Sequence, residues 1–405
     1  MIALQIARNY LRDKMQQRVA AFQLDTQIEH TGNTAARAHI AIHDQHNCVG
    51  KISVERAIDS VLQKSTGMTN KQAHNCIILH TPVFTFEEHE SLLLPMLAYF
   101  ALRQARILGC QNVIIATHHH PLDQQLIQLL KLEPISHLPS LHAQRLEYAI
   151  HSAYEQCDVS QREFIQSYFI HEILDSFEIW LTTLFQDSWF TAIKTQTISK
   201  EQYIASLFNL HQFVKHTTRL AARCVAMCEN RDLRNHYIYH LKGEVNHEVI
   251  IESDLRALRA DVNYLLNSHV PHTATAGFMV LQESITGFKR DAVLMLACPF
   301  IAEGMTANIG YDFVENLFAT IRNWGIKSPE SVSRFLTSHM KTDGGDDGHW
   351  IRVINRIDEF VHTENQMQEF INMLRLAMSS YAHGLNANID DLELWRADAK
   401  IEVMA

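Results

Sequence analysis

Glycine and proline are missing from long parts of this 405-residue chain. No glycine lies between Gly109 and Gly243, and no proline lies between Pro139 and Pro271. Because both residues interrupt helices, their absence predicts long helices across that region. The sequence before it is different, with short β-rich runs separated by turns.

Cysteine patterns and long apolar runs are also lacking. The seven cysteines include no C-x-x-C pair, which excludes a disulfide framework or a zinc knuckle and favours buried free thiols. The longest apolar run, "VLMLACPFIA", is too short to span a bilayer, and the N-terminus has no signal-peptide core. We therefore expect a cytoplasmic protein that does not contact a membrane.

Positive charge is scarce as well. The net charge is -10, and no basic stripe is interleaved with aromatic residues, which opposes nucleic-acid binding. The length is sufficient for two domains, each with its own core. We expect a small molecule as the partner, and the helix-rich part also offers faces for a homodimer.

The first part of the chain predicts an α+β domain over residues 1–145. Alternating runs such as "ARAHIAIHD" and "CVGKISVE" predict strands, and "ESLLLPMLAYFALRQARILG" predicts an amphipathic helix. A strand "QNVIIATH" and a helix "LDQQLIQLLKL" follow. Residues 146–405 should form an all-α domain.

The order of elements in the first domain resembles the GCN5-related acyltransferase fold, from "CVGKISVE" through "ALRQARILGCQNVIIAT" to "LLKLEPI". In that family a glycine-rich turn holds the coenzyme A pyrophosphate at a helix N-terminus. Here the turn "TPVFTFEEHESLLLP" has no glycine and places Glu87, Glu88 and Glu90 where the phosphates would lie. We therefore expect a degenerate domain that serves packing, dimerisation or substrate delivery.

The second domain carries a Glu-x-x-His pair. Glu244 and His247 are three residues apart, so on a helix both side chains would project from one face. Carboxylate-bridged di-iron helical proteins use this unit to bind metal. A solvated helix surface carries such pairs too. His240, Glu248 and Asp254 lie close enough along the chain to orient ligands, or they lie at the surface.

A single carboxylate, Glu303, ends the long apolar run. A buried unpaired carboxylate is costly, so it must be neutralised, hydrogen-bonded or bound to a cation. The alternative is a glutamate at a helix end that reaches solvent.

The stretch "HMKTDGGDDGHW" at 339–350 supplies a third cluster. On a helix, His339, Asp343 and Asp346 would share one face, with His349 one turn further. Its three glycines weaken that helix, so it would become ordered when metal binds. The alternative is a solvated loop that ends with Asp346 or Asp347 capping the next helix.

The order of these three clusters resembles the heme-oxygenase-like di-iron oxidases and oxygenases, over roughly residues 150–395. That family binds two irons through Glu-x-x-His, a glutamate on another helix, and His-x-x-x-Asp-x-x-His on a third. The resemblance implies an all-α heme-oxygenase-like bundle and a ligand set drawn from Glu244, His247, Glu303, His339, Asp343, Asp346 and His349.

The last motif departs from the family pattern. Without a gap, Asp346 stands where the final histidine should be. With a three-residue insertion, Asp346 and His349 form the Asp-x-x-His pair and Asp343 becomes a bystander. We prefer the gapped alignment because it restores a third histidine.

The resemblance implies two Fe(II) ions, O2 as co-substrate and no catalytic residue beyond the metal ligands. The implied reactions are N-oxygenation of an amine, C–C cleavage of an amino acid, or decarboxylation or desaturation of a fatty acid. One alternative is a noncatalytic scaffold or binding protein, because the last motif is defective. Another is an acyltransferase with an unusual phosphate site and an accessory helical domain.

Overall fold

The structure is a computed structural model that describes residues 3–9, 22–31, 34–44, 47–56, 75–85, 90–116, 120–135, 138–345 and 347–390. Its internal contacts divide the chain into an α+β unit, residues 13–167, and a helical unit formed by residues 1–12 and 168–405. The division therefore falls inside a helix, some twenty residues beyond the expected boundary at residue 145.

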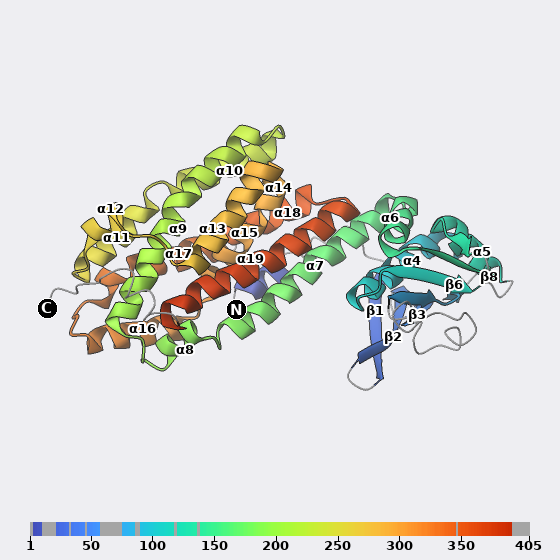
Figure 1. The fold of residues 1–405 in the computed structure, drawn as a ribbon, viewed down its shortest axis with the longest axis horizontal. Coiled ribbons are helices and arrows are strands. Elements are labelled where there is room, and N and C mark those ends of the chain that lie inside the picture. Colours follow the sequence, from blue (N-terminus) through green and yellow to red (C-terminus); the bar gives the residue numbers. More distant parts are fainter. Residues whose placement is uncertain are drawn as a thin grey trace. The chain divides into compact units, whose positions relative to one another are not determined.

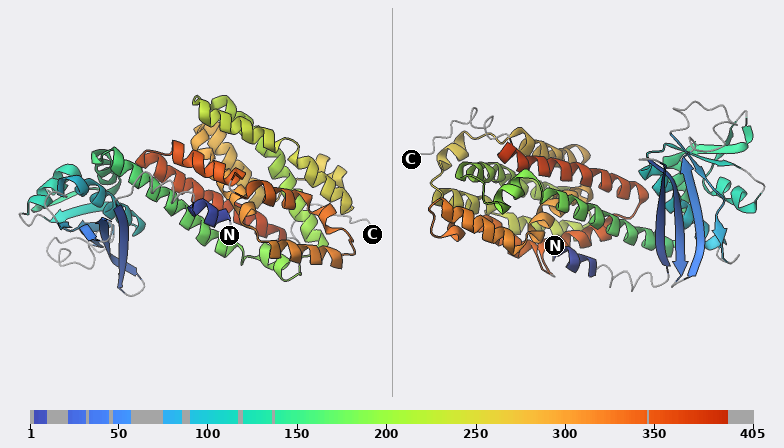
Figure 2. Two further views of the ribbon diagram at one scale, coloured as in Figure 1. Left: turned by 180° about the vertical axis from the view of Figure 1, so that it is seen from behind. Right: turned by 90° about the horizontal axis from the view of Figure 1, so that it is seen from below.

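The α+β unit contains one mixed sheet. Its strands are β1 (Phe22–Thr31), β2 (Thr34–Asp44), β3 (Asn47–Arg56), β4 (Cys76–Leu79), β5 (Val83–Phe84), β6 (Asn112–Ala116), β7 (Glu133–Ile135) and β8 (Leu138–Arg145). Their order is β1-β2-β3-β4-β6-β8-β7, with β5 paired to β3. The β4–β6 pair is parallel and the other pairs are antiparallel. The first strands of the sheet, in blue, lie side by side in the right-hand view of Figure 2.

The central strand β4 of this sheet is fully apolar. All four residues of β4, "CIIL", are buried, as expected for a strand covered on both faces. Helix α4 (Glu90–Ile107) packs on β2, β3 and α6 (Leu146–Gln156), while α5 (Pro121–Leu129) packs on β6. The α+β class is confirmed. Of the expected acidic turn, Glu87 and Glu88 lie outside the described residues and Glu90 begins α4.

The helical unit includes the second part of α7 (Val159–Leu184), which crosses the division. It continues with α8 (Ser188–Lys194), α9 (Lys200–Met227), α10 (Arg231–Glu244), α11 (His247–Ala257), α12 (Val262–Asn267), α13 (Thr273–Glu283), the π-helix η3 (Ser284–Lys289), α14 (Ala292–Met295), α15 (Ala297–Asn308), α16 (Tyr311–Asn323), the 3-10 helix η4 (Pro329–Val332), α17 (Arg334–Asp343), α18 (His349–Phe360) and α19 (Glu364–Asp390). Figure 1 shows α9, α13, α15 and α19 running through this bundle.

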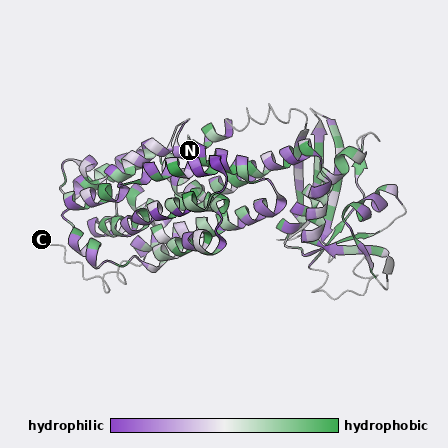
Figure 3. Ribbon diagram, turned by 90° about the horizontal axis from the view of Figure 1, so that it is seen from above, coloured by the Kyte–Doolittle hydropathy of each residue, from purple (hydrophilic) through white to green (hydrophobic). Residues whose placement is uncertain are grey.

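Aromatic residues fill the centre of the bundle. The ring centroids of Phe177 and Trp350 are 5.2 Å apart, and those of Phe300 and Trp350 are 5.8 Å apart. Gly304 makes this packing possible, because a Cβ there would lie 2.6 Å from both the Phe177 ring and the Trp350 indole nitrogen. The helices carry hydrophobic and hydrophilic residues along their length (Figure 3), in agreement with amphipathic bundle helices.

The first residues of the chain belong to this helical unit. Residues 3–9 are helical, and the backbone N–H of Leu4 donates to Asn308 Oδ1 over 2.9 Å. Arg8 forms ion pairs with Asp175 and Glu178 at 2.5 and 2.6 Å. The sequence pattern predicted this segment in the first domain, because its long-range partners cannot be read from local periodicity.

Within the described residues, no single helix is long and apolar enough to cross a bilayer. One bent pair of segments, Ala292–Asn308 with Tyr311–Asn323, reaches that length and composition together, across a bend of 76°.

Candidate metal centre

The Glu-x-x-His pair lies at a break between two helices. Glu244 is the last residue of α10 and His247 is the first residue of α11. Asn246 between them has φ +69°, in the left-handed region that asparagine tolerates better than most residues. The expectation that one helix carries both residues was therefore wrong. The turn nevertheless brings the two side chains together.

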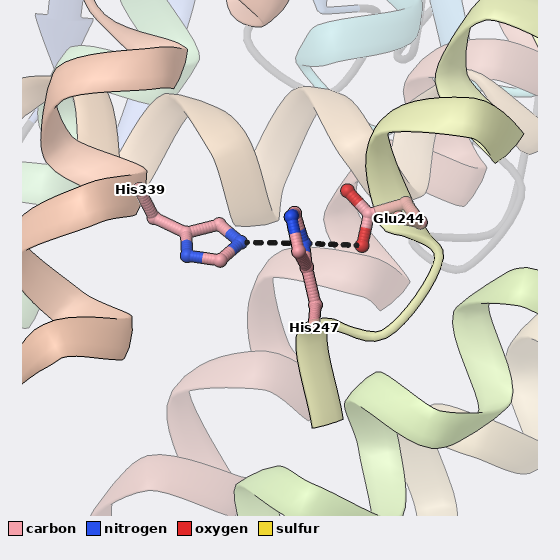
Figure 4. A group of neighbouring side chains, drawn as sticks. All are labelled: Glu244, His247 and His339. Carbon is pink, nitrogen blue, oxygen red and sulfur yellow. Dashed lines mark hydrogen bonds and ion pairs between the residues drawn. The ribbon is translucent and has the colours of Figure 1, made fainter. Parts of the chain in front are cut away.

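His247 stands between two other predicted ligands. Its Nδ1 is 3.3 Å from Glu244 Oε2 and 3.1 Å from His339 Nε2 (Figure 4). Glu244 is buried, whereas the two histidines are half-buried. One carboxylate and two imidazoles from α10, α11 and α17 thus converge closely enough to share one cation.

A second group of ligand atoms shares Glu244. It contains His240, Glu244 and Glu303, whose ligand atoms all lie within 4.8 Å of one another. His240 Nδ1 is 3.2 Å from Glu303 Oε1. Neither Glu303 oxygen has a hydrogen-bond partner among the described residues.

Asp343 and His349 adjoin this second group. Asp343 ends α17, His349 begins α18, and Asp343 Oδ1 is 3.2 Å from His349 Nδ1. The Thr306 hydroxyl donates to Asp343 Oδ2 over 2.5 Å. Asp343, the bystander of the preferred alignment, is therefore beside the other ligands. Asp346, which that alignment chose, lies outside the described residues.

Glycine sets the path of the chain between these two residues. A Cβ on Gly348 would lie 2.3 Å from the backbone carbonyl oxygen of Asp343, so no larger residue fits without a shift. Gly348 also precedes α18 as its cap residue, in place of the expected aspartate. The glycines in this stretch thus turn the chain at the end of α17.

The electrostatics of the cluster depend on burial. Burial raises the pKa of Glu303 well above its ordinary value, and the negative charges of Asp343 and Glu244 raise it further. Burial also opposes ionisation of Glu244, but its contacts with His247 and the other nearby histidines bring its pKa to about 2. Burial lowers the pKa of His240, although the negative charge of Glu244 acts in the opposite direction.

Neighbouring groups orient the predicted ligands. His339 Nδ1 donates to the backbone carbonyl of Phe335 over 2.8 Å, which leaves Nε2 as the nitrogen directed at the cluster. The Thr217 hydroxyl lies 3.3 Å from Glu244 Oε2. Hydrogen bonds of this kind commonly orient the ligands of metal sites.

A pocket of about 730 Å³, including its mouth, opens beside the cluster. Most of its wall is apolar, and α9 and α15 contribute apolar side chains such as Phe213, Leu220 and Pro299. His240, Glu244, Glu303, His339 and Asp343 line it as well. The polar cluster therefore faces a largely apolar space, which is the usual composition of a small-molecule site.

The residues present fit a divalent metal. Mixed carboxylate and imidazole donors suit iron, zinc and manganese. Three buried carboxylates close together are costly unless cations or protons compensate them. The two Glu303 oxygens without hydrogen-bond partners, and the raised pKa of that carboxyl, are what a cation at this position would relieve.

His240 is a ligand candidate that the sequence analysis placed only among the orienting residues. The signal was available, because His240 precedes Glu244 by four residues and both lie on one face of α10. Its contact with Glu303, which lies on α15, could not be read from the sequence.

Fold and site together define a helical bundle with a buried carboxylate–imidazole cluster beside an apolar pocket. No protein-family model matches the chain, and no curated protein matches it. Among solved structures, a domain of unknown function with a heme oxygenase-like fold from Shewanella denitrificans OS217 is 18% identical with a TM-score of 0.48, and the match covers 56% of this chain and 95% of that one.

Two TenA homologues are also similar in structure. The one from Pseudomonas syringae pv. tomato is 12% identical, with a TM-score of 0.44, covering 54% of this chain and 91% of that one. The one from Pyrococcus furiosus is 13% identical, with a TM-score of 0.41, covering 54% and 99%. These likenesses concern about half of the chain and say nothing about its reaction.

Proposed function

We propose that the helical unit is a nonheme di-iron oxygenase or oxidase that binds two Fe(II) ions and uses O2 to oxidise a small amine, amino acid or fatty-acid-like molecule. The observation that carries this proposal is the position of Glu244, which belongs to two groups of converging ligand atoms at once. A carboxylate shared in this way is suited to bridge two cations.

The residues divide between two metal positions. His247 and His339 would hold the first together with Glu244, and His240 and Glu303 would hold the second with the same carboxylate. Asp343, which lines the same pocket and lies 3.2 Å from His349, would be a further ligand candidate there. Bound iron would supply the electrons that reduce dioxygen.

The chain itself has three tasks in this chemistry. The Phe335 carbonyl fixes the ring of His339, and the Thr306 hydroxyl fixes the carboxylate of Asp343. The apolar wall of the pocket limits water around the reacting carbon atoms. The same wall accommodates an apolar substrate body next to the polar cluster.

The buried carboxylates favour this function over a noncatalytic scaffold. A packing role would be served at least as well by apolar residues, because burying several carboxylates without cations destabilises the fold. A protein that served only as a scaffold would have no need of Glu244, Glu303 and Asp343 around one pocket.

Metal titration tests the proposal. The metal-free protein would be titrated with Fe(II) without oxygen, then mixed with oxygenated buffer while the visible spectrum is recorded. We expect about two irons per chain for the wild type, with loss of binding in Glu244→Ala and His339→Ala and of one iron in Glu303→Gln. A transient absorption that depends on oxygen would accompany binding.

A matched control uses another His–Glu pair of the helical unit. His211 Nε2 is 3.5 Å from Glu252 Oε1, outside the cluster. Glu252→Gln should therefore bind iron as the wild type does. Absence of stoichiometric iron binding in the wild type would reject the proposal and favour the scaffold interpretation.

A further inference from the structure

The wall of the pocket away from the cluster contains no charged side chain among the described residues. Every acidic residue and every histidine that lines it belongs to the cluster, and no lysine or arginine lines it. The Tyr237 hydroxyl is already engaged, since it donates to the Ala292 carbonyl over 2.6 Å. Thr217 likewise donates to the Val214 carbonyl over 2.7 Å.

Gln282 is different because its carbonyl oxygen is unused. The side chain lines the pocket, is 3% exposed, and its Oε1 has no hydrogen-bond partner in the described part of the chain. Burial raises the pKa of the neighbouring Cys298 thiol, and the amide of Gln282 beside it acts in the opposite direction. A buried acceptor without a donor is destabilising, so a ligand that supplies one gains affinity.

The backbone around Gln282 is also unusual. Gln282 lies in the last turn of α13, directly before the π-helix η3. The Thr286 hydroxyl donates to the Gln282 backbone carbonyl over 3.1 Å. Short π-helical segments are frequent at functional sites, because the wider turn redirects the side chains next to it.

The axial rise along α15 and α10 indicates how far the neighbours of Gln282 lie from the cluster. Cys298, a neighbour of Gln282, precedes Glu303 by five residues on α15, which corresponds to roughly 7–8 Å along the helix axis. Tyr237, close to Cys224 and Cys298, precedes Glu244 by seven residues on α10, or roughly 10 Å. Along these two helices, the neighbours of Gln282 are therefore separated from the predicted ligands by roughly one to two helical turns.

We propose that this pocket binds an elongated, mostly apolar molecule that donates an O–H or N–H from a neutral group to the Gln282 carbonyl oxygen. The distal wall offers an ammonium group no countercharge, so an alcohol or amide is favoured there over a protonated amine. That the other end of the molecule is the one oxidised rests on the proposed function. The hydrogen bond to Gln282 does not depend on it.

Two isomeric probes test the inference on metal-free protein. Hexan-1-ol has a donor, whereas methyl pentyl ether has the same heavy atoms and only an acceptor. We expect the alcohol to bind roughly tenfold more tightly by isothermal titration calorimetry. Gln282→Met should remove this preference, and Gln212→Met, which changes a buried glutamine outside the pocket lining, should keep it.

A charged variant provides a second test that does not depend on removing the amide. Gln282→Glu adds a negative charge at the acceptor, so it should make hexan-1-ammonium the preferred probe over the alcohol. Equal binding of alcohol and ether to the wild type, a preference for the ether, or no binding of either would overturn the inference. The iron titration is independent, so its failure with the alcohol preference intact would reject only the proposed function.

Discussion

The carboxylate of Asp254 on α11 accepts a hydrogen bond from the backbone N–H of Phe335 in the first turn of α17, over 3.0 Å. Ser333, which precedes α17, makes no side-chain cap hydrogen bond. Asp254 thus acts as the cap of α17 from a different helix. It joins the helix that begins with His247 to the helix that carries His339.

Removal of this cap should weaken both the fold and the metal centre. Asp254→Ala leaves the Phe335 N–H without its acceptor, so we expect a loss of about 1–2 kcal/mol in the free energy of unfolding. Because His339 is one turn further along α17, iron affinity should fall about tenfold. Urea denaturation and iron titration measure the two effects. Unchanged iron affinity would show that the cap does not position His339.

The pKa of Asp254 predicts a pH dependence of stability. Burial raises it to about 6, against about 4 for an aspartate in an unfolded chain. Between these values the folded state keeps a proton that the unfolded state has lost. The contribution of the protonated Asp254 carboxyl to the free energy of unfolding is therefore fully present below about pH 4. It decreases as the pH rises through about 6.

Asp254→Asn should remove this component, because an amide does not titrate in that range. The wild type should lose stability relative to the variant between pH 4.5 and 6.5, measured by urea denaturation of the metal-free proteins. Parallel pH profiles of the two proteins would contradict the assignment.

The Thr306 hydroxyl should matter through Asp343. Thr306→Val keeps the shape of the side chain but removes the 2.5 Å hydrogen bond to Asp343 Oδ2. We expect about tenfold weaker iron binding. Thr320→Val is the control, since the buried Thr320 hydroxyl donates to the Asn316 carbonyl over 2.9 Å, away from the cluster. Equal iron affinities in the two variants would exclude an orienting role for Thr306.

Gly348→Ala should destabilise the turn between α17 and α18. The added Cβ would meet the Asp343 carbonyl oxygen at 2.3 Å, and overpacking of this kind costs about 1–3 kcal/mol. Gly310→Ala places its Cβ in open space, so its effect should be small. Thermal denaturation of both variants measures this difference. The prediction is wrong if Gly348→Ala is as stable as Gly310→Ala.

The sequence predicts which residues gather better than how the backbone brings them together. Glu244, His247 and His339 were predicted as ligands and lie within contact of one another. The helix break at Asn246 was missed, because a single residue with positive φ leaves no mark on hydrophobic periodicity. Likewise, the spacing of His339 and Asp343 predicted one helix face, but not the end of α17 at Asp343.

The α+β unit shows the same limit. Alternation in "ARAHIAIHD" and "CVGKISVE" predicted β2 and β3 nearly residue for residue. The parallel pairing of β4 with β6 is a long-range contact that local pattern does not encode. The attachment of residues 3–9 to the helical unit is another, since it depends on Asn308 and Asp175 far along the chain.

The break at Asn246 changes what a bound cation would do to the chain. Were Glu244 and His247 on one continuous helix, a metal held by both would only reinforce a geometry already fixed by backbone hydrogen bonds. Because they end one helix and begin another, the same metal would be a cross-link that sets the angle between α10 and α11. Through His339 it would also join these helices to α17, which lies far along the chain. A cross-link between residues so far apart in the sequence reduces the conformational entropy of the unfolded chain. The metal would therefore also stabilise the folded bundle.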